Sequence, residues 1–169
     1  MKIINSNNIL VSVLVPISIL ILFLYTENAN SLNEKIVLDE PFYVESYKDT
    51  REKPEPQNQS YTYTFTAKGI INGTLNVNTE VNATKTWINN DIVHLNGNAK
   101  FVTDKNDIAP YNFEAITNYN ADGTLEDRGV AIFNDSATGE LSFLKNTVAI
   151  YKESGDNSGN RTFLMWQWK

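Results

Sequence analysis

The chain has 169 residues, enough for one domain with a real core, and 41% of them are hydrophobic, so its bulk is globular rather than disordered. The net charge of −6 disfavours nucleic acid as a partner, because phosphate backbones attract basic proteins. The absence of cysteine excludes disulfides, thiolate metal sites, cysteine nucleophiles and a lipid-modified N-terminal cysteine. No phosphate-binding glycine loop or dinucleotide fingerprint occurs, so no cofactor is expected.

An uncharged apolar run, residues 9–25 from Ile9 to Tyr25, follows a short N-terminal segment, residues 1–8, that carries Lys2. The run would span on the order of 25 Å as a helix, which is short for a membrane helix but long for the core of a signal peptide. The sequence around Ala29 is a poor cleavage site, which favours an uncleaved signal anchor over a removed signal peptide. Positive-inside logic places residues 1–8 in the cytoplasm and the C-terminal domain outside the cell membrane, or the domain is secreted if the signal is cleaved.

Residues 26–60 have the composition of a linker. Residues 26–34 are polar, and residues 49–60 are charged and contain Pro54 and Pro56, as expected for a solvated loop. The intervening residues 35–48 include two short apolar groups and could supply an extra edge strand. The main domain is therefore predicted over residues 61–169, with the earlier strand left open.

The clearest pattern is a period of two over residues 61–87, which is typical of strands with one packed and one solvated face. Asn72 and Gly73 divide this stretch with a dipeptide that favours a tight type I′ hairpin turn. The apolar parity on either side of the turn contains Tyr61, Tyr63, Phe65, Ala67, Gly69, Leu75, Val77, Val81, Ala83 and Trp87. Two long antiparallel strands are predicted.

The same alternation predicts strands over residues 92–102, 111–119 and 125–133, separated by short polar turns. Residues 140–144 and 147–152 are expected to form two short strands or one bent strand. In the final strand, the parity assigned to the interior contains Thr162, Leu164, Trp166 and Trp168.

Seven to nine regularly spaced strands predict an all-β antiparallel meander. Closure into a barrel of about eight strands is favoured over a two-sheet sandwich, because open edges in so Thr- and Val-rich a chain would promote aggregation. Small residues on the apolar faces, such as Gly69, Gly97 and Gly129, provide the points at which barrel strands coil. Such a barrel is filled by side chains or holds one small ligand.

Several aromatic residues share the inward parity and could grip a small, partly apolar ligand, although core packing is the commoner role of such residues. Asp127 and Lys85 also lie on the inward parity. Burying a charge there is costly unless the charge is paired or lies at the solvent-exposed rim of the barrel. Either could orient a ligand, unless it lies at a strand end or beside a bulge. The candidate ligand-binding residues are Tyr63, Trp87, Tyr111, Tyr119, Asp127 and Tyr151.

Other polar features favour ordinary surface roles. His94 is the only histidine and lies on a polar parity, which leaves no histidine cluster for zinc. The Asp- and Asn-rich segments 104–107 and 122–127 lack the full spacing of a calcium loop and are predicted to be turns, so no metal site is expected. If the domain is extracellular, the glycosylation candidates are Asn58, Asn82, Asn134 and Asn160, whereas Asn72 lies in a tight turn.

Four segments carry a family resemblance: G-I-I-N-G-T-L at 69–75, G-N-A-K-F at 97–101, A-T-G-E-L-S-F-L-K-N at 137–146 and M-W-Q-W-K at 165–169. Their order resembles a group of small exported prokaryotic proteins, and the likeness covers about residues 42–169. It implies a single barrel domain behind an export signal, without an assigned activity or catalytic residues. In outline the domain is also similar to calycin and allene-oxide-cyclase-like barrels, by fold analogy alone.

Three functions are compatible with these patterns. The preferred hypothesis is a non-enzymatic extracytoplasmic barrel, attached to the membrane through residues 9–25, that binds a small apolar or aromatic molecule or an envelope protein. The second is a barrel enzyme of isomerase or cyclase type that uses Asp127 or Glu114 with a tyrosine. The third is a structural component of the cell envelope, which would have a filled interior and an exposed apolar patch.

Overall fold

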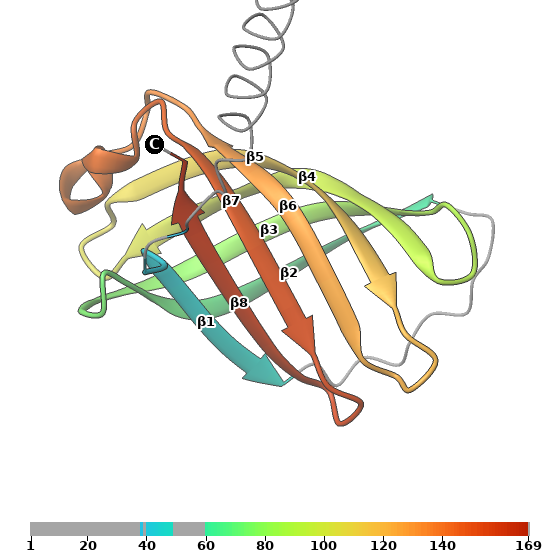
Figure 1. Ribbon diagram of the computed structural model, residues 1–169. Coiled ribbons are helices and arrows are strands. Elements are labelled where there is room, and N and C mark those ends of the chain that lie inside the picture. Colours follow the sequence, from blue (N-terminus) through green and yellow to red (C-terminus); the bar gives the residue numbers. More distant parts are fainter. Residues whose placement is uncertain (1–37, 39, 49–59, 169) are drawn as a thin grey trace, which may run out of the picture. The chain divides into compact units, whose positions relative to one another are not determined.

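The computed structural model describes residues 38, 40–48 and 60–168, which form eight strands and one short 3-10 helix (Figure 1). The elements are β1 (Tyr43–Lys48), β2 (Ser60–Ile71), β3 (Leu75–Trp87), β4 (Ile92–Thr103), β5 (Ile108–Tyr119), β6 (Leu125–Phe133), η2 (Gly139–Leu144), β7 (Val148–Gly155) and β8 (Asn160–Gln167). The apolar run at 9–25 lies outside the described residues. Within them, no helix has the length and apolar character needed to cross a membrane.

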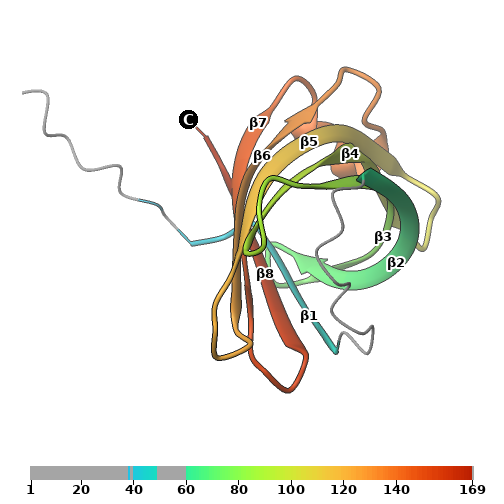
Figure 2. The same cartoon turned by 90° about the vertical axis from the view of Figure 1, so that its right-hand side faces the viewer.

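Each strand pairs antiparallel with the next, and β1 pairs with β8, so the sheet closes into a barrel (Figure 2). The predicted all-β barrel of about eight strands is confirmed, and the sandwich alternative is wrong. Closure gives every strand two neighbours, and the seam is shortest between β1 and β2, which pair only through residues 43–45 and 69–71 in the described chain.

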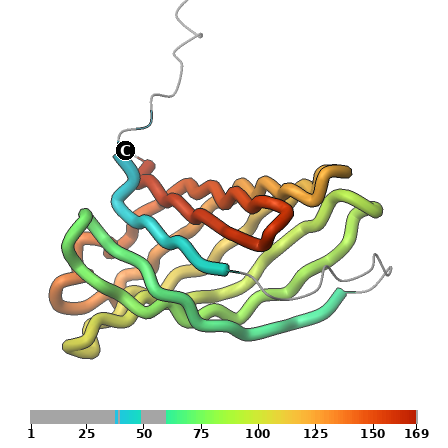
Figure 3. Tube along the Cα trace, turned by 90° about the horizontal axis from the view of Figure 1, so that it is seen from below, coloured from blue at the N-terminus to red at the C-terminus, as the bar shows by residue number. Residues whose placement is uncertain are grey.

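The closing strand β1 lies in the segment that was expected to be a linker with an edge strand. It has partners on both sides: Tyr43 is opposite Ile71 of β2 and Met165 of β8. Figure 3 shows β1 lying beside β8. The barrel therefore begins at β1, earlier in the chain than the start at Tyr61 that the alternation predicts.

The period of two predicts the inward face of β2 to β7 correctly, but its assignment for β8 is wrong. Met165 is fully buried opposite Tyr43 and Tyr151, whereas Trp168 is 60% exposed. The inward residues of β8 are thus Arg161, Phe163 and Met165. Large apolar residues occupy both parities of this strand, so alternation could not distinguish its faces.

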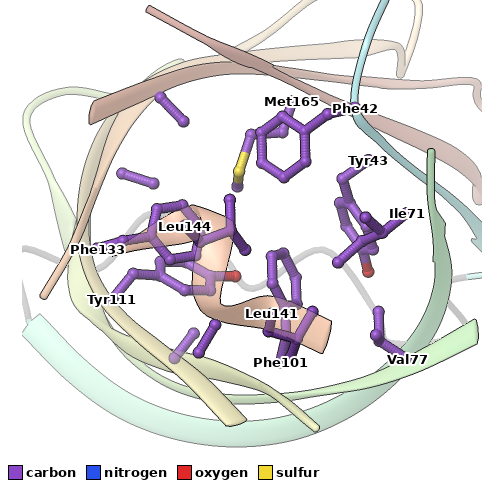
Figure 4. Packing of buried hydrophobic residues seen from close by; sticks show 14 of the residues in the cluster. Phe42, Tyr43, Ile71, Val77, Phe101, Tyr111, Phe133, Leu141, Leu144 and Met165 are labelled. Carbon is purple, nitrogen blue, oxygen red and sulfur yellow. The ribbon is translucent and has the colours of Figure 1, made fainter. Parts of the chain in front are cut away.

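Residues 140–144, predicted to be a strand, instead belong to the 3-10 helix η2. Leu141 and Leu144 are three positions apart and so lie on the same side of this helix, where both are fully buried. They pack among the buried side chains at one end of the barrel, as Figure 4 shows. The surrounding cluster includes Phe42, Ile71, Phe101, Phe133 and Met165. This end is called the closed end below.

The β2–β3 turn has three residues rather than two, because Ile71 and Leu75 are register partners. Asn72 and Gly73 have φ angles of 48° and 70°, the positive values expected of this dipeptide. The four segments that carry the family resemblance contribute this turn, η2 and buried residues such as Phe101 and Met165. The resemblance therefore rests on residues that pack at the closed end, and it gives no information about the residues at the other end of the barrel.

Candidate functional site

The opposite end of the barrel contains a cavity of about 100 Å³ that is partly open to solvent. Its lining includes Lys85 near the end of β3, Tyr119 at the end of β5 and Arg161 near the start of β8. The strands are continuous from one end to the other, so the closed end supports this cavity as a rigid scaffold. This end is called the open end.

Aromatic rings make up much of the cavity wall. Four of the candidate tyrosines, Tyr63, Tyr111, Tyr119 and Tyr151, lie on the inward parity and line the cavity. The ring of Tyr63 stacks on Phe65 with centroids 6.0 Å apart, and that of Tyr151 lies 4.9 Å from Phe163. These contacts hold the rings in place, so a flat or apolar ligand would meet a preformed surface.

Glycines create the room that two large tyrosines need. A Cβ atom at Gly69 would collide with the ring of Tyr43, and one at Gly129 would collide with that of Tyr151. Both glycines share the inward parity of their strands, so each lets a ring cross the barrel interior. The repeated small residues of the sequence thus serve the placement of aromatic rings.

Glu45 of β1 is 6% exposed and borders the cavity. Tyr43 donates a hydrogen bond of 2.5 Å to Glu45 Oε2, and its hydroxyl also lies 2.7 Å from Thr79 Oγ1. Burial raises the pKa of Glu45 to about 7, against the opposing effect of the Tyr43 bond and with a contribution from the charge of Glu153. This carboxyl therefore titrates near neutral pH.

Asp127 of β6 is 4% exposed and also lines the cavity, as its inward parity predicted. Among the described residues, no group forms a hydrogen bond with its buried Oδ1 atom. Burial raises the pKa of Asp127 to about 8, and the nearby Glu153 adds to this rise, while a hydrogen bond from Thr117 and the charge of Lys85 oppose it. A buried oxygen without a partner is costly, and it suits a ligand that brings a donor.

Two basic side chains share the cavity with these carboxyls. Lys85 Nζ donates to Tyr119 Oη at 2.8 Å and lies 5.4 Å from the centre of that ring. Arg161 Nε lies 3.9 Å from Glu153 Oε1, which also accepts a hydrogen bond of 2.9 Å from Tyr47. The lining thus contains three acidic residues and two basic ones.

Trp87 is the candidate ligand-binding residue that the structure does not place on the cavity lining. It is 9% exposed and stacks on Tyr119, with ring centroids 5.5 Å apart, so it supports the rim from behind. Three charged lining residues were missed from the sequence: Glu45, Glu153 and Arg161. Parity with Tyr151 was a signal that could have found Glu153, whereas the alternation in β1 and β8 is too weak to have identified Glu45 or Arg161.

The remaining candidates lie outside the cavity. Glu114 is exposed and lies 2.8 Å from His94 Nε2 on the outer face, as the polar parity of His94 predicts. Segment 104–107 is a turn, in which Asn106 has a φ of 65°, and Asp122 accepts a hydrogen bond from Thr124 in the next turn. No group of three potential metal ligands occurs in the part of the chain that the structure describes.

The glycosylation candidates Asn82, Asn134 and Asn160 are all exposed, and Asn58 lies outside the described residues. Asn160 Nδ2 donates to Asp156 Oδ2 at 2.7 Å, and Asn134 Oδ1 accepts a bond from the Ser136 amide. Their use as sugar acceptors stays a prediction.

Together these features define a closed antiparallel barrel with a small aromatic and acidic cavity at one end. No family model, curated protein or solved structure matches the chain. The resemblance to small exported barrel proteins stays a prediction that rests on the four sequence segments.

Proposed function

We propose that this protein is a binding domain that holds a small molecule in the cavity at the open end of the barrel. The observation that carries the proposal is the unpartnered Oδ1 atom of Asp127, a buried carboxylate oxygen beside fixed aromatic rings. Barrels of about eight strands commonly hold one ligand in this way. A ligand that donates a hydrogen bond to Asp127 would satisfy the one buried side-chain oxygen that lacks a partner among the described residues.

The contrast between the two barrel ends supports this role. At the closed end, Leu141 and Leu144 of η2 pack among apolar side chains, whereas the buried acidic residues of the described chain, Glu45 and Asp127, both line the cavity. At the open end, Asp127, Glu45 and Glu153 keep carboxyls in the interior, where burial is costly. Apolar side chains at these positions would give a more stable barrel, so the carboxyls indicate a functional use of the space.

The location of the domain is part of the proposal. The apolar run at 9–25 would anchor the chain in the cell membrane and leave the barrel outside, or would be removed if the domain is secreted. Sequencing the N-terminus of the mature protein distinguishes these forms. A mature chain that begins at Met1 fits the anchor, and one that begins after Ala29 fits secretion.

The binding role is tested by thermal unfolding of the full chain with a set of small ring compounds of positive, zero and negative charge. Ala83 is 1% exposed and lines the cavity, so Ala83→Leu should fill the space and abolish any ligand-dependent rise in Tm. Thr84→Leu places the same side chain on the outer face of β3 and serves as the control. Absence of any Tm shift in the unmodified chain, or an equal shift in Ala83→Leu, would contradict binding in the cavity.

A barrel enzyme is the second candidate, and it is favoured by one observation. Asp127 has a pKa of about 8, close to the working range of a general acid or base. Burial raises the pKa values of Tyr111 and Tyr151 well above the usual range, so these hydroxyls would donate hydrogen bonds but would not accept a proton as bases. Glu114 lies on the outer face and has no part in such a site. Chemical conversion of a bound compound, abolished in Asp127→Asn, would favour this candidate.

The structural role in the envelope is supported less well. A structural component would have a filled interior, whereas this barrel has a cavity at its open end. Exposed apolar residues do form a strip on the outer face. Ile132 lies opposite Val148, and the backbone N–H of Trp168 donates a hydrogen bond to the Val148 carbonyl oxygen. A structural role would explain the exposed apolar strip, but it would not explain the carboxyls in the interior.

A further inference from the structure

The three acidic residues of the cavity form one row across the barrel wall. Asp127 of β6 is opposite Glu153 of β7, Glu153 is opposite Phe163 of β8, and Phe163 is opposite Glu45 of β1. Side chains directly opposite on neighbouring strands point to the same side and lie close together. The row therefore places three carboxyls on one side of the cavity, with an aromatic ring among them.

The members of this row differ in their partners. Glu153 has Tyr47 and Arg161 beside it, and Glu45 has Tyr43. Asp127 retains a buried oxygen that nothing in the described chain contacts by a hydrogen bond. Like charges placed opposite each other are unfavourable, so a positive group beside Asp127 would stabilise the whole row.

The facing wall provides the complementary surface. Tyr63 and Phe65 of β2 and Tyr111 and Tyr119 of β5 present rings to the same cavity. Lys85 Nζ donates a hydrogen bond of 2.8 Å to the hydroxyl of Tyr119, so an ammonium group is already bound by a tyrosine at this rim. Three acidic and two basic residues line the cavity, and neither Lys85 nor Arg161 forms a hydrogen bond with the buried Oδ1 of Asp127.

We propose that the ligand is a small organic monocation, an alkyl or arylalkyl amine, whose ammonium group binds Asp127 while its apolar part packs on the tyrosine rings. This inference rests on the proposed binding function and specifies the ligand of the same cavity. A cavity of about 150 Å³ holds benzene, and the volume here is about 100 Å³. The ligand is therefore no larger than one ring or a short chain, part of which extends through the side of the cavity that is open to solvent.

Proton release accompanies binding of such a ligand. Asp127 and Glu45 have pKa values of about 8 and 7 in the free protein, so at pH 7 Asp127 is largely protonated and Glu45 is partly protonated. An ammonium group beside them lowers both values, and the displaced proton passes to the buffer. The charged or titratable groups that face this space from the other strands are Tyr63 on β2, Lys85 on β3, Tyr111 and Tyr119 on β5, Tyr151 and Glu153 on β7, and Arg161 on β8.

Calorimetric titration of the full chain at pH 7 with benzylamine, benzyl alcohol and benzoate tests the ligand class, since the three compounds share a ring and differ in charge. Benzylamine should bind at least tenfold more tightly than benzyl alcohol, and benzoate should bind more weakly still. Titrations of benzylamine in phosphate and Tris buffers should differ in heat, because these buffers take up the released proton with different enthalpies.

Asp127→Asn should lower the affinity for benzylamine at least tenfold and reduce proton release, with little effect on benzyl alcohol. Glu114→Gln, which removes an exposed carboxylate from the outer face, is the control and should leave both unchanged. Tighter binding of benzyl alcohol or benzoate, or binding of benzylamine without proton release, would overturn the amine assignment and leave the binding role standing. Failure of every compound in the wider ring set to bind would overturn both.

Discussion

Asp127 on β6 lies directly opposite Glu153 on β7, and both carboxyls line the same cavity inside the barrel. This pairing places like charges beside each other in an interior where charge is already costly. Arg161 and Tyr47 compensate Glu153, whereas Asp127 keeps one oxygen that accepts no hydrogen bond from the described residues. Burial is the main cause of the raised pKa of Asp127, and the charge of Glu153 adds to it.

The stability of the free protein should fall as pH rises. The pKa of Asp127 is about 8 and that of Glu45 about 7 in the folded state, both above their ordinary values near 4. The folded state therefore binds more protons than the unfolded state, and stability that is complete below pH 4 is lost as pH rises through 7 and 8. Each unit of pKa difference corresponds to about 1.4 kcal/mol, so the loss should amount to several kcal/mol.

Urea unfolding at pH 4.5 and pH 8.5 measures this effect in the unmodified chain and in Asp127→Asn. The substitution should flatten the pH dependence and make the protein more stable than the unmodified chain at the higher pH. The exposed Glu114→Gln should retain the original slope. Equal slopes in the unmodified chain and Asp127→Asn would show that Asp127 ionises in the folded protein as readily as in the unfolded chain.

Gly69 and Tyr43 should be energetically coupled. A Cβ atom at Gly69 would collide with the Tyr43 ring, so Gly69→Ala should cost about 1–3 kcal/mol through overpacking. Tyr43→Leu removes the ring and should abolish that additional cost, although it is itself destabilising because Tyr43 is fully buried. A double-mutant cycle by urea unfolding measures the coupling, and additive effects would contradict a direct contact.

The helix η2 should stabilise the barrel without shaping the cavity. Leu144→Ala should lower the free energy of unfolding by about 2–5 kcal/mol, because this fully buried side chain fills the closed end. Ser142→Ala, at an exposed position of the same helix, should have little effect. Affinity for benzylamine should be unchanged in Leu144→Ala under conditions where it is folded. A large loss of affinity would show that the two ends are not independent.

Much of the fold was predictable because a strand exposes its faces with a period of two. This period alone predicts that Tyr63, Tyr111 and Asp127 point into a shared interior, and all three line the cavity. It failed for β8, where Leu164 and Trp166 compete with Phe163 and Met165, and only pairing with β1 and β7 decides the inward face. It failed for η2 because Leu141 and Leu144 follow a three-residue spacing.

The candidate site was predictable only in its aromatic part. Glu45 belongs to a strand of six residues within an apparent linker, too short to display a convincing alternation. Glu153 and Arg161 lie near the ends of β7 and β8, where charged residues ordinarily reach solvent. Their meeting with Asp127 depends on the register of four strands around the closed barrel, which local sequence does not encode.

Amide NMR spectra of the full chain titrated with benzylamine test whether the open end of the barrel binds a small amine. Binding there should give saturable shifts at cavity residues such as Asp127, Glu153 and Tyr63, with Leu144 and Phe101 at the closed end unaffected. Shifts confined to the outer face or the closed end, or no shifts at all at millimolar benzylamine, would contradict it.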